Sequence, residues 1–459
     1  MVFRTTRSIR RYIVMLAVVS VLFYMSARHM WTSDGSIELA YTESDILADA
    51  ILLGSSKEMR IKHVNQKYCG RDVCRFTLPL VITEQESKAQ EHFRQIAFLS
   101  GKLDRTIVLP NVHTSHLGAC RRYPFEFYYS HSWLDNNSRF FSYITMEDFR
   151  AWISERHEIE AIPTARELFV ESQPETHLLQ KNDNCFRPLF TFEQSAKQFQ
   201  LDDPENQNRR EGNYTEILFN ALSDDLPTDN SNSTITGPEV LHLYYDRRFG
   251  FIEEPEVNVP LAYSAKWEGL ADDIADQLKP FVAVHWRMER LEPLSNLQPC
   301  AETLVEKLAN IDVTGKPNVF LLTDYPHLLQ TSQSAPESMS FKLEQLQQEH
   351  HDAIRYLYKH VNVTLTTLDR VNQLLPYDEL PRENWNIIPV SPYVQPPDPS
   401  ILGIVDKLVA MRAQWFLAGE PGKCGKTSSF TRRIILHRQD AYHNGDENII
   451  VPFDYFNVS

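Results

Sequence analysis

The stretch GEPGKCGKTSSF, from Gly419 to Phe430, combines glycines, a Gly-Lys-Thr triplet and two serines, which are residue types that can surround a phosphate group. A nucleotide-triphosphate loop has the spacing G-x-x-x-x-G-K-[ST], and counting back five positions from Gly425 gives Glu420 where a glycine is required. Pro421 also removes a backbone amide that would have to face the phosphates. The stretch is therefore not a nucleotide-triphosphate loop.

The residues that follow, SSFTRRIILHR, predict a helix that starts at a serine cap. The free amides of a helix N-terminus attract anions in any fold. Two interpretations of Ser428 and Ser429 are open: they contact a phosphate group, or they only cap the helix.

Other polar residues follow apolar runs or form a cluster. Asp324 follows the run NVFLLT and could hold either a ribose or a neighbouring loop. The cluster EHHD, at residues 349–352, contains residue types that bind metals. Adjacent histidines point to different faces of a helix, which favours a solvated surface over a metal site.

The elements that must position these residues alternate between helix and strand in the second half of the chain. The pattern predicts a helix over 267–280, a strand over 281–287, a helix over 301–310, a strand over 318–324, a helical region over 344–358, a helix over 401–412 and a strand over 413–419. Such alternation is typical of an α/β fold with a doubly wound parallel sheet. Ligands of such sheets bind beyond the carboxyl ends of the strands, where His285, Arg287 and the loop before Ser428 are expected.

The first half also contains a helical pattern that changes into a strand pattern. Residues 87–112 predict a helix that leads into a buried strand, TIVLP, after Arg105. Residues 201–237 are rich in Asp, Asn, Ser and Thr, so we expect an exposed insertion there.

Three segments, taken in order, resemble the GDP-fucose-dependent fucosyltransferases, above all the protein O-fucosyltransferases. They are His285-Trp286-Arg287 at a strand end, the segment from Asp406 to Phe416, and Ser428-Ser429-Phe430-Thr431 followed by two arginines. The segment EHFRQIAFLSGKLDRTIVLP in the first half is also similar to this family. The resemblance covers roughly residues 75–125 and 275–440.

The resemblance implies a GT-B fold of two Rossmann-like domains that face a cleft, and an inverting, metal-independent transfer of fucose from GDP-fucose. The chain has no Asp-x-Asp tripeptide, so the metal-and-diphosphate clamp of another large transferase class is missing. Arg287 is suited to neutralise the departing diphosphate, because a guanidinium stays charged and can hold two phosphate oxygens. The amides and hydroxyls around Ser428, Ser429 and Phe430 would add a second clamp.

By the same resemblance, Asp406 would accept hydrogen bonds from the guanine edge and His285 would contact the nucleotide. The alternatives are an acid at a helix N-terminus for Asp406 and a strand-end histidine bonded to the backbone for His285. We expect no cofactor and no metal.

A general base must take the proton of the acceptor hydroxyl. Most family members have a Gly-rich segment ending in Asn near the first strand, whereas this chain has TEQESKAQEHF. One family branch places a catalytic Glu three residues before that Asn, and a gapless comparison puts Glu84 at its position. Glu84 is our candidate base and Glu86 the second candidate; the alternative is that both are solvated acids in the first turn of a helix.

Composition and the N-terminus indicate the compartment. The chain has 459 residues, enough for two domains, and its net charge of -15 argues against nucleic acid as a partner. Arginines in residues 1–11 precede the apolar run of residues 12–31, which we interpret as a signal-anchor helix that leaves a cytoplasmic tail and a luminal chain. A cleaved signal peptide is the alternative, but the segment ends in bulky residues. The boundaries expected are a stem over 32–67, an N-terminal Rossmann-like acceptor-side domain over 68–265 and a nucleotide-sugar-binding domain over 266–459.

Cysteines and sequons agree with a luminal location. The six cysteines include no Cys-x-x-Cys, so disulfides are favoured over zinc, and a bond between Cys300 and Cys424 would fix the loop before Ser428. N-glycosylation sequons lie at Asn136, Asn213, Asn232, Asn362 and Asn457.

The sequence thus predicts a Golgi or ER type II membrane enzyme that transfers fucose from GDP-fucose to a hydroxyl of a protein or glycan. A non-catalytic relative that acts as a luminal binding or scaffold protein is the first alternative, because of the altered EQES segment. A transferase that uses another sugar nucleotide is the second.

Overall fold

The computed structural model describes residues 56–171, 184–192, 196–200, 237–245, 252, 254–289, 291–311, 318–325, 345–367, 385–390, 398 and 400–458. The expected anchor over 12–31, most of the expected stem and nearly all of the polar insertion over 201–237 lie outside these residues. Within the described ranges, no helix combines the length and apolar character needed to cross a membrane.

The first sheet is built from strands of the N-terminal half. Its strands are β1 (Phe76–Ile82), β2 (Thr106–Val108), β3 (Val112–His113), β4 (His116–Leu117), β5 (Tyr143–Ile144), β6 (Thr164–Glu171), β7 (Thr191–Phe192), β8 (Lys197–Gln200) and β9 (Val240–Tyr245). The pairs β1 with β9 and β6 with β9 are parallel, whereas β4 runs antiparallel to β1 and to β3. This half therefore contains a mainly parallel sheet.

Helices cover both faces of the first sheet. The helices described in this half are α3 (Lys57–Cys69), α4 (Glu86–Lys102), α5 (Ser132–Asn136) and α6 (Met146–Glu158), with 3-10 turns η1 (Phe125–Phe127), η2 (Arg187–Leu189) and η3 (Pro255–Asn258). Leu243 of β9 is buried in the same cluster as Phe93 of α4. Tyr244, the next residue along β9, is buried with Trp152 of α6. Because successive strand residues point to opposite faces, α4 and α6 lie on opposite sides of the sheet.

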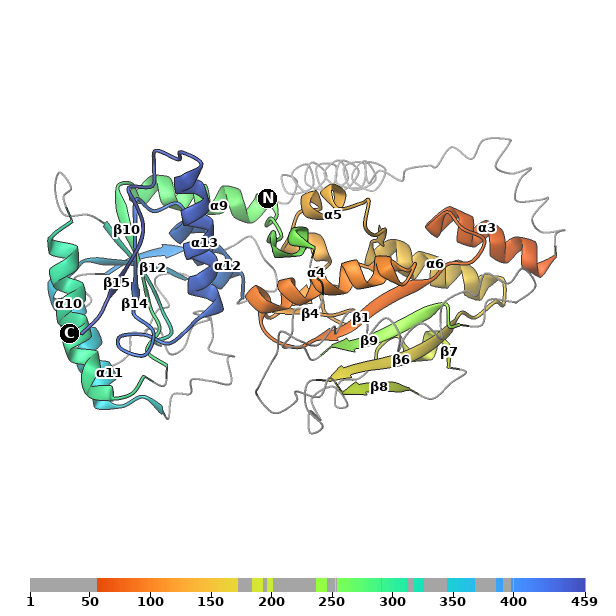
Figure 1. Ribbon diagram of the computed structural model, residues 1–459, viewed down its shortest axis with the longest axis horizontal. Coiled ribbons are helices and arrows are strands. Elements are labelled where there is room, and N and C mark those ends of the chain that lie inside the picture. Colours follow the sequence, from red (N-terminus) through yellow and green to blue (C-terminus); the bar gives the residue numbers. More distant parts are fainter. Residues whose placement is uncertain are drawn as a thin grey trace, which may run out of the picture. The chain divides into compact units, whose positions relative to one another are not determined.

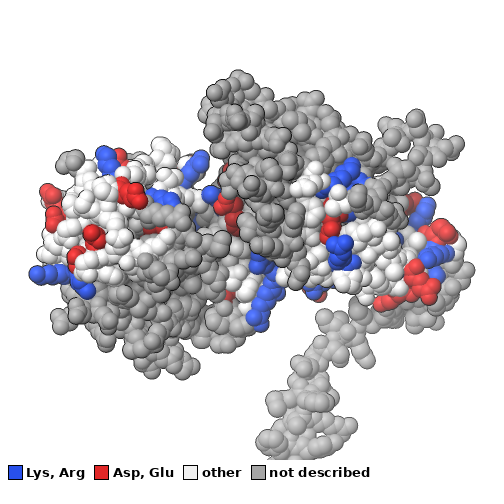
Figure 2. All heavy atoms as spheres, turned by 90° about the horizontal axis from the view of Figure 1, so that it is seen from below, with Lys and Arg blue, Asp and Glu red and all other residues white. Residues whose placement is uncertain are grey.

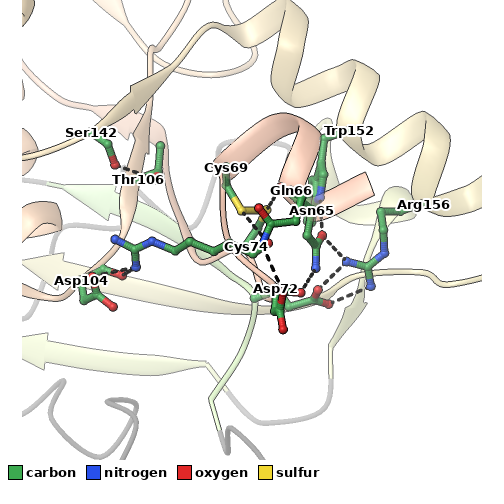
Figure 3. The surroundings of a disulfide bond; sticks show 12 residues. Asn65, Gln66, Cys69, Asp72, Cys74, Asp104, Thr106, Ser142, Trp152 and Arg156 are labelled. Atoms are coloured by element: carbon green, nitrogen blue, oxygen red, sulfur yellow. Dashed lines mark hydrogen bonds and ion pairs between the residues drawn. A yellow bond between two sulfur atoms is a disulfide. The ribbon is translucent and has the colours of Figure 1, made fainter. Parts of the chain in front are cut away.

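The end of α3 is fastened to the first sheet beside the Cys69–Cys74 disulfide (Figure 3). The side chain of Asn65 is fully buried and donates to the backbone oxygen of Asp72 at 2.8 Å. Its own oxygen accepts from Trp152 Nε1 at 3.0 Å and from Arg156 Nη1 at 3.3 Å, and Figure 3 shows these side chains converging. These contacts hold the end of α3 and the residues before β1 against α6.

The second sheet is entirely parallel, in the order β13-β12-β11-β10-β14-β15. Its strands are β10 (Phe281–Trp286), β11 (Asn318–Thr323), β12 (Val363–Thr367), β13 (Trp385–Pro389), β14 (Trp415–Gly419) and β15 (Val451–Phe456). Its helices are α9 (Ala265–Leu278), α10 (Leu297–Ala309), α11 (Gln348–His360), α12 (Ser400–Met411) and α13 (Ser429–His443), with the 3-10 turn η4 (Leu294–Asn296).

The helices of this half form two layers, as Figure 1 shows, with α10 and α11 on one face of the second sheet and α12 and α13 on the other. Along β10, Phe281 and Ala283 are buried with α12, whereas Val282 and Val284 are buried with α10 and α11. The α/β class with parallel sheets is therefore confirmed, and the helices and strands predicted for the second half are present. The domain limits at 68, 266 and 459 stay a prediction.

All six cysteines form disulfides, Cys69–Cys74, Cys120–Cys185 and Cys300–Cys424. The preference for disulfides over zinc and the pairing of Cys300 with Cys424 are both confirmed. Asn136 and Asn362 have exposed side chains, as a glycosylated asparagine must.

Figure 2 draws the charged side chains on one face of the molecule. On the face drawn in Figure 2, Lys and Arg lie among Asp, Glu and uncharged residues.

Candidate active site

The carboxyl end of β10 is the point where the order of the second sheet reverses. The chain continues from β10 to β11 on one side and returns later to β14 on the other. In doubly wound sheets, ligands bind at such a reversal. A cavity of about 240 Å³ lies there. Its lining comes from both halves of the chain: Gln85, Glu86, Ser87, Thr114 and Ser115 from the first, and His285, Arg287, Glu289, Leu322, Thr323, Asp324, Ser400, Gly403, Ile404, Asp406, Lys407, Ser428, Ser429 and Phe430 from the second.

Arg287 is fixed in this cavity by an acid that sequence reasoning missed. Its Nε and Nη2 donate to Glu289 Oε2 at 3.1 and 2.5 Å, and its Nη1 donates to the backbone oxygen of Thr427 at 3.4 Å. Glu289 is almost fully buried and also pairs with Lys426 at 3.0 Å. The guanidinium is thus held beside the serine turn, where the sequence predicted it.

Asp324 holds a neighbouring loop. Its two carboxylate oxygens accept from the backbone amides of Met288 and Glu289 at 2.8 and 2.9 Å. Burial raises the pKa of Asp324 to about 6, although these amides act in the opposite direction. Of the two roles considered, the structure shows the loop-holding one, and the loop it holds carries Arg287.

The serine turn is a capped helix start. Ser428 is the N-cap of α13, and its Oγ accepts from the amide of Thr431 at 3.3 Å. Ser428 is buried and Ser429 is exposed, and both line the cavity together with Phe430. The predicted cap at Ser428 is confirmed. Contact with a phosphate stays a prediction.

The glycines before the turn allow the backbone at Gly419 to lie very close to the backbone at Cys424 and Gly425. A Cβ on Gly419 would lie 2.5 Å from the oxygen of Cys424, and a Cβ on Gly425 would lie 2.8 Å from the oxygen of Gly419. Gly422 has φ +80, which side chains rarely adopt. Trp286 Nε1 donates to the Cys424 oxygen at 2.9 Å, and the disulfide to Cys300 secures the same residue. This close approach explains the Gly pattern without a nucleotide-triphosphate loop.

His285 contacts the serine turn through its side chain. Its Nδ1 lies 2.7 Å from Thr431 Oγ1, and its ring lies 5.2 Å from the ring of Phe430. Burial, helped by the positive charge of Arg287, lowers the pKa of His285 to about 3. The alternative of a histidine bonded to the backbone is therefore wrong, and a neutral imidazole lies at the cavity wall.

Asp406 lies in the middle of α12, which begins at Ser400. The alternative that it is an acid at a helix N-terminus is therefore wrong. Its Oδ1 accepts from Thr366 Oγ1, and burial raises the pKa of Asp406 to about 7 despite that hydrogen bond. The carboxyl group lines the cavity and is poised to change its charge near neutral pH.

The two candidate bases have different surroundings. Glu84 precedes α4, has φ 76, and pairs with Lys88 at 3.2 Å. Glu86, the first residue of α4, lines the cavity with a side chain only 7% exposed. The alternative of two solvated acids in a first helical turn is therefore wrong for Glu86.

Glu86 forms a buried ion pair with Lys407 of α12, at 2.5 Å. Its other donors are Gln90, Tyr129, Tyr263 and Ser87, at 3.0, 3.0, 2.8 and 3.1 Å. Burial raises the pKa of Glu86, but Lys407 and the hydroxyl donors outweigh burial and hold this pKa below its usual range. Lys407 also lies 5.2 Å from the ring centre of Phe430. The pair therefore joins α4 to the serine turn.

A second buried acid links the same two halves at the start of α12. Asp398, which is fully buried, accepts from the amide of Thr114 at 3.2 Å, from Tyr128 at 2.6 Å and from Ser400 Oγ at 2.5 Å. Thr114 and Ser115 both have positive φ, 48 and 61, in the turn between β3 and β4. Asp398 thus fixes a strained turn at the cavity wall.

The EHHD cluster is divided between separate contacts. His350 Nδ1 accepts from the amide of Gln347 at 3.1 Å, and His351 Nδ1 lies 2.6 Å from the hydroxyl of Tyr325. His350 is buried, so the expectation of a fully solvated surface is wrong for that residue. Among the described residues, no group of three or more His, Cys, Asp or Glu is arranged to bind a metal.

Comparisons with known proteins give solved structures only: no protein-family model and no curated protein matches the chain. POFUT1 in complex with GDP matches with a TM-score of 0.44 and 15% identity, over 84% of this chain and 99% of that chain. POFUT1 in complex with GDP-fucose matches with a TM-score of 0.44 and 15% identity, over 84% and 98%. The fucosyltransferase NodZ from Bradyrhizobium matches with a TM-score of 0.35 and 11% identity, over 79% and 92%.

NodZ is named as a fucosyltransferase, which is the class of protein that the sequence resembles.

Proposed function

We propose that this chain is a GT-B glycosyltransferase that transfers fucose from GDP-fucose to a hydroxyl of a protein or glycan, with inversion and without a metal. One observation carries the proposal. Arg287 and the Ser428-capped start of α13 line the same cavity at the strand-order reversal, with Arg287 Nη1 only 3.4 Å from the Thr427 oxygen. Solved structures of POFUT1 in complex with GDP-fucose and of NodZ soaked with GDP-fucose agree with this donor.

Fucose transfer breaks the bond between the anomeric carbon and the β-phosphate, so negative charge develops on the diphosphate. Preorganised charges and amides aimed at that group lower the barrier. Arg287 provides a fixed cation because Glu289 and Thr427 orient it. The exposed Ser429 and the first amides of α13 provide the second clamp.

The lining also holds a group that could bind the nucleoside end of the donor. A guanine presents two N–H donors on one edge, and a single carboxylate can accept both. Asp406 lines the cavity with such a carboxyl group. His285 and Phe430 supply a neutral ring and an apolar face to the same cavity.

A donor panel tests the proposal most directly. The purified full chain would be incubated with GDP-fucose, GDP-mannose, UDP-galactose and UDP-N-acetylglucosamine, with and without EDTA, and release of the nucleoside diphosphate would be measured. We expect GDP release from GDP-fucose alone, and no effect of EDTA. Release from another donor supports the other-sugar alternative, and release abolished by EDTA refutes the metal-independent mechanism.

Arg287→Ala separates catalysis from folding in the same assay. It should lower GDP release by a factor of about 10² to 10³, as loss of one transition-state donor does elsewhere, while circular dichroism shows that the chain stays folded. Tight GDP binding by the wild-type chain without turnover would identify a binding protein. Absence of GDP binding in calorimetry would favour the scaffold alternative.

We further propose that the chain is a single-pass type II protein of the Golgi or ER membrane. Residues 12–31 would be its anchor, and the catalytic domain would lie in the lumen. The three disulfides support an oxidising compartment. Endoglycosidase treatment of the full chain made in eukaryotic cells should increase its gel mobility, and replacing Asn136 and Asn362 by Gln should reduce that shift. A chain without glycans that is accessible to protease in intact microsomes would contradict this location.

A further inference from the structure

Ser87 stands between the cavity and the buried acid Glu86. Its Oγ donates to Glu86 Oε2 at 3.1 Å and accepts from Lys407 Nζ at 2.9 Å. Among the described residues Ser87 Oγ has no third partner, so one lone pair of this hydroxyl remains available. Ser87 is half-buried and lines the cavity, whereas Glu86 is buried.

A substrate proton can reach Glu86 only through a neighbouring side chain, because the acceptor positions of its carboxylate are filled. Its Oε1 accepts three donors, from Gln90, Tyr129 and Tyr263, and its Oε2 accepts Lys407 and Ser87. Five donors fill the acceptor positions of a carboxylate. A new donor from a substrate would have to displace one of them, but a proton shifted along the Ser87 hydrogen bond would not.

We propose that Ser87 relays the proton of the acceptor hydroxyl to Glu86, an inference that rests on the proposed fucosyl transfer. As the acceptor oxygen bonds to the anomeric carbon, the bond from that carbon to the diphosphate oxygen breaks and its electron pair leaves with GDP. The acceptor proton moves to Ser87 Oγ, and the proton of Ser87 moves to Glu86 Oε2. Protonated Glu86 then returns its proton to solvent through Ser87 after the product has left.

Two other groups at the cavity already have hydrogen-bond partners. The imidazole of His285 uses Nδ1 with Thr431. The oxygens of Asp324 are occupied by two backbone amides. Glu84 is not among the residues that line the cavity, and it pairs with Lys88. Lys407 acts here as a positioning residue, because its ammonium group fixes both Ser87 and Glu86.

Azide as the attacking nucleophile tests the relay without knowledge of the natural acceptor. Water must lose a proton when it attacks GDP-fucose, whereas the azide anion has none to lose. For the full chain with Ser87→Ala, we expect GDP release with water to fall by a factor of about 10² or more. Added azide should restore GDP release and yield fucosyl azide, and GDP affinity should be unchanged in calorimetry.

Matched variants complete the experiment. Ser87→Thr keeps a hydroxyl and should keep most of the water-dependent rate, and Glu86→Gln should behave like Ser87→Ala. Ser132→Ala, at an exposed serine at the start of α5, should change nothing. Arg287→Ala should lose both reactions, because azide cannot replace a clamp on the leaving group.

The outcomes distinguish the two proposals. If Ser87→Ala keeps the wild-type rate with water, or if azide fails to restore GDP release while GDP binding is intact, the relay is refuted and the proposed function stands. If the wild-type chain releases no GDP from GDP-fucose with either nucleophile, the proposed function is refuted and the relay with it.

Discussion

Two nitrogens of Arg287, Nε and Nη2, donate to one oxygen of Glu289, at 3.1 and 2.5 Å. Lys426 pairs with the other oxygen at 3.0 Å. A single buried carboxylate therefore lies between two cations, and the balance of these three charges is positive before any ligand binds.

Replacing Glu289 by Ala should destabilise the protein by about 1–3 kcal/mol, because Arg287 and Lys426 lose their shared partner at a partly buried position. Saturating GDP should recover part of this loss, since its diphosphate supplies negative charge at the same place. Thermal unfolding with and without GDP measures both effects. An equal loss in the two conditions would mean that GDP does not bind beside Arg287.

Asp406 should make GDP affinity depend on pH. Its pKa is raised to about 7, and hydrogen bonds from a guanine edge require the ionised carboxylate. Affinity should therefore increase roughly tenfold between pH 6 and pH 8, since the ionised fraction changes by about that factor around a pKa near 7. Calorimetry of wild type and Asp406→Asn should show the increase in wild type only.

Asp406 should make the stability of the fold decrease as pH rises, whereas it makes GDP affinity increase. Its folded pKa of about 7 lies above its ordinary value of 3.8, so the folded state binds more protons between these two values. The free energy of unfolding of the ligand-free protein should fall as pH rises from about 4 to 7 and then become constant with respect to this group. Urea unfolding at several pH values, with Asp406→Asn as the control, checks the sign: a contribution that increases over this range would contradict the burial of the acid.

The Cys300–Cys424 disulfide should matter more for stability than the Cys69–Cys74 disulfide. The first joins residues 124 apart in the sequence, and the second joins residues 5 apart. In the chain-entropy description, replacing both cysteines of the long loop by Ala costs about 4–5 kcal/mol, and of the short loop about 2 kcal/mol. Chemical unfolding of the two double variants measures the difference, and weaker GDP binding is expected only for the first, whose loop leads into Ser428.

Arg438 should contribute strongly to the stability of the second half, although it is not among the residues that line the cavity. Its buried guanidinium donates to the backbone oxygens of Ala410, Met411, Ala413, Gln414, Val451 and Pro452. Arg438→Met leaves these acceptors without a donor and should cost about 3 kcal/mol or more. Arg139→Met, at a side chain 71% exposed, should cost less than about 1 kcal/mol. Equal unfolding temperatures for the two variants would refute this role.

The strands found from sequence are those with continuous apolar runs, such as FVAVHW in β10 and WFLAG in β14. The strand β12, with the sequence VTLTT, has three threonines, and β15, VPFDYF, has a proline and an acid. These polar residues interrupt the apolar pattern by which a strand is recognised in the sequence. The strands are buried by packing against distant parts of the chain, which a local pattern does not show. The order of the sheet is equally non-local.

The site shows the same limit. Arg287 and Ser428 were predictable because each follows directly on an element that the pattern defines. Lys407 was missed because its partner Glu86 lies 321 positions away. Two adjacent charges, Asp406 and Lys407, in the otherwise apolar helix ILGIVDKLVAM are the signal that could have drawn attention to it.

Helix α12 is tied to the first half of the chain at two points, just before its start through Asp398 to Thr114 and within its second half through Lys407 to Glu86. The walls of the cavity are therefore assembled when the protein folds, and the entropic cost of ordering them falls on folding. Binding of the donor requires no further rearrangement of these walls. Stopped-flow mixing with GDP should accordingly give one exponential phase whose rate increases linearly with GDP concentration, without a plateau.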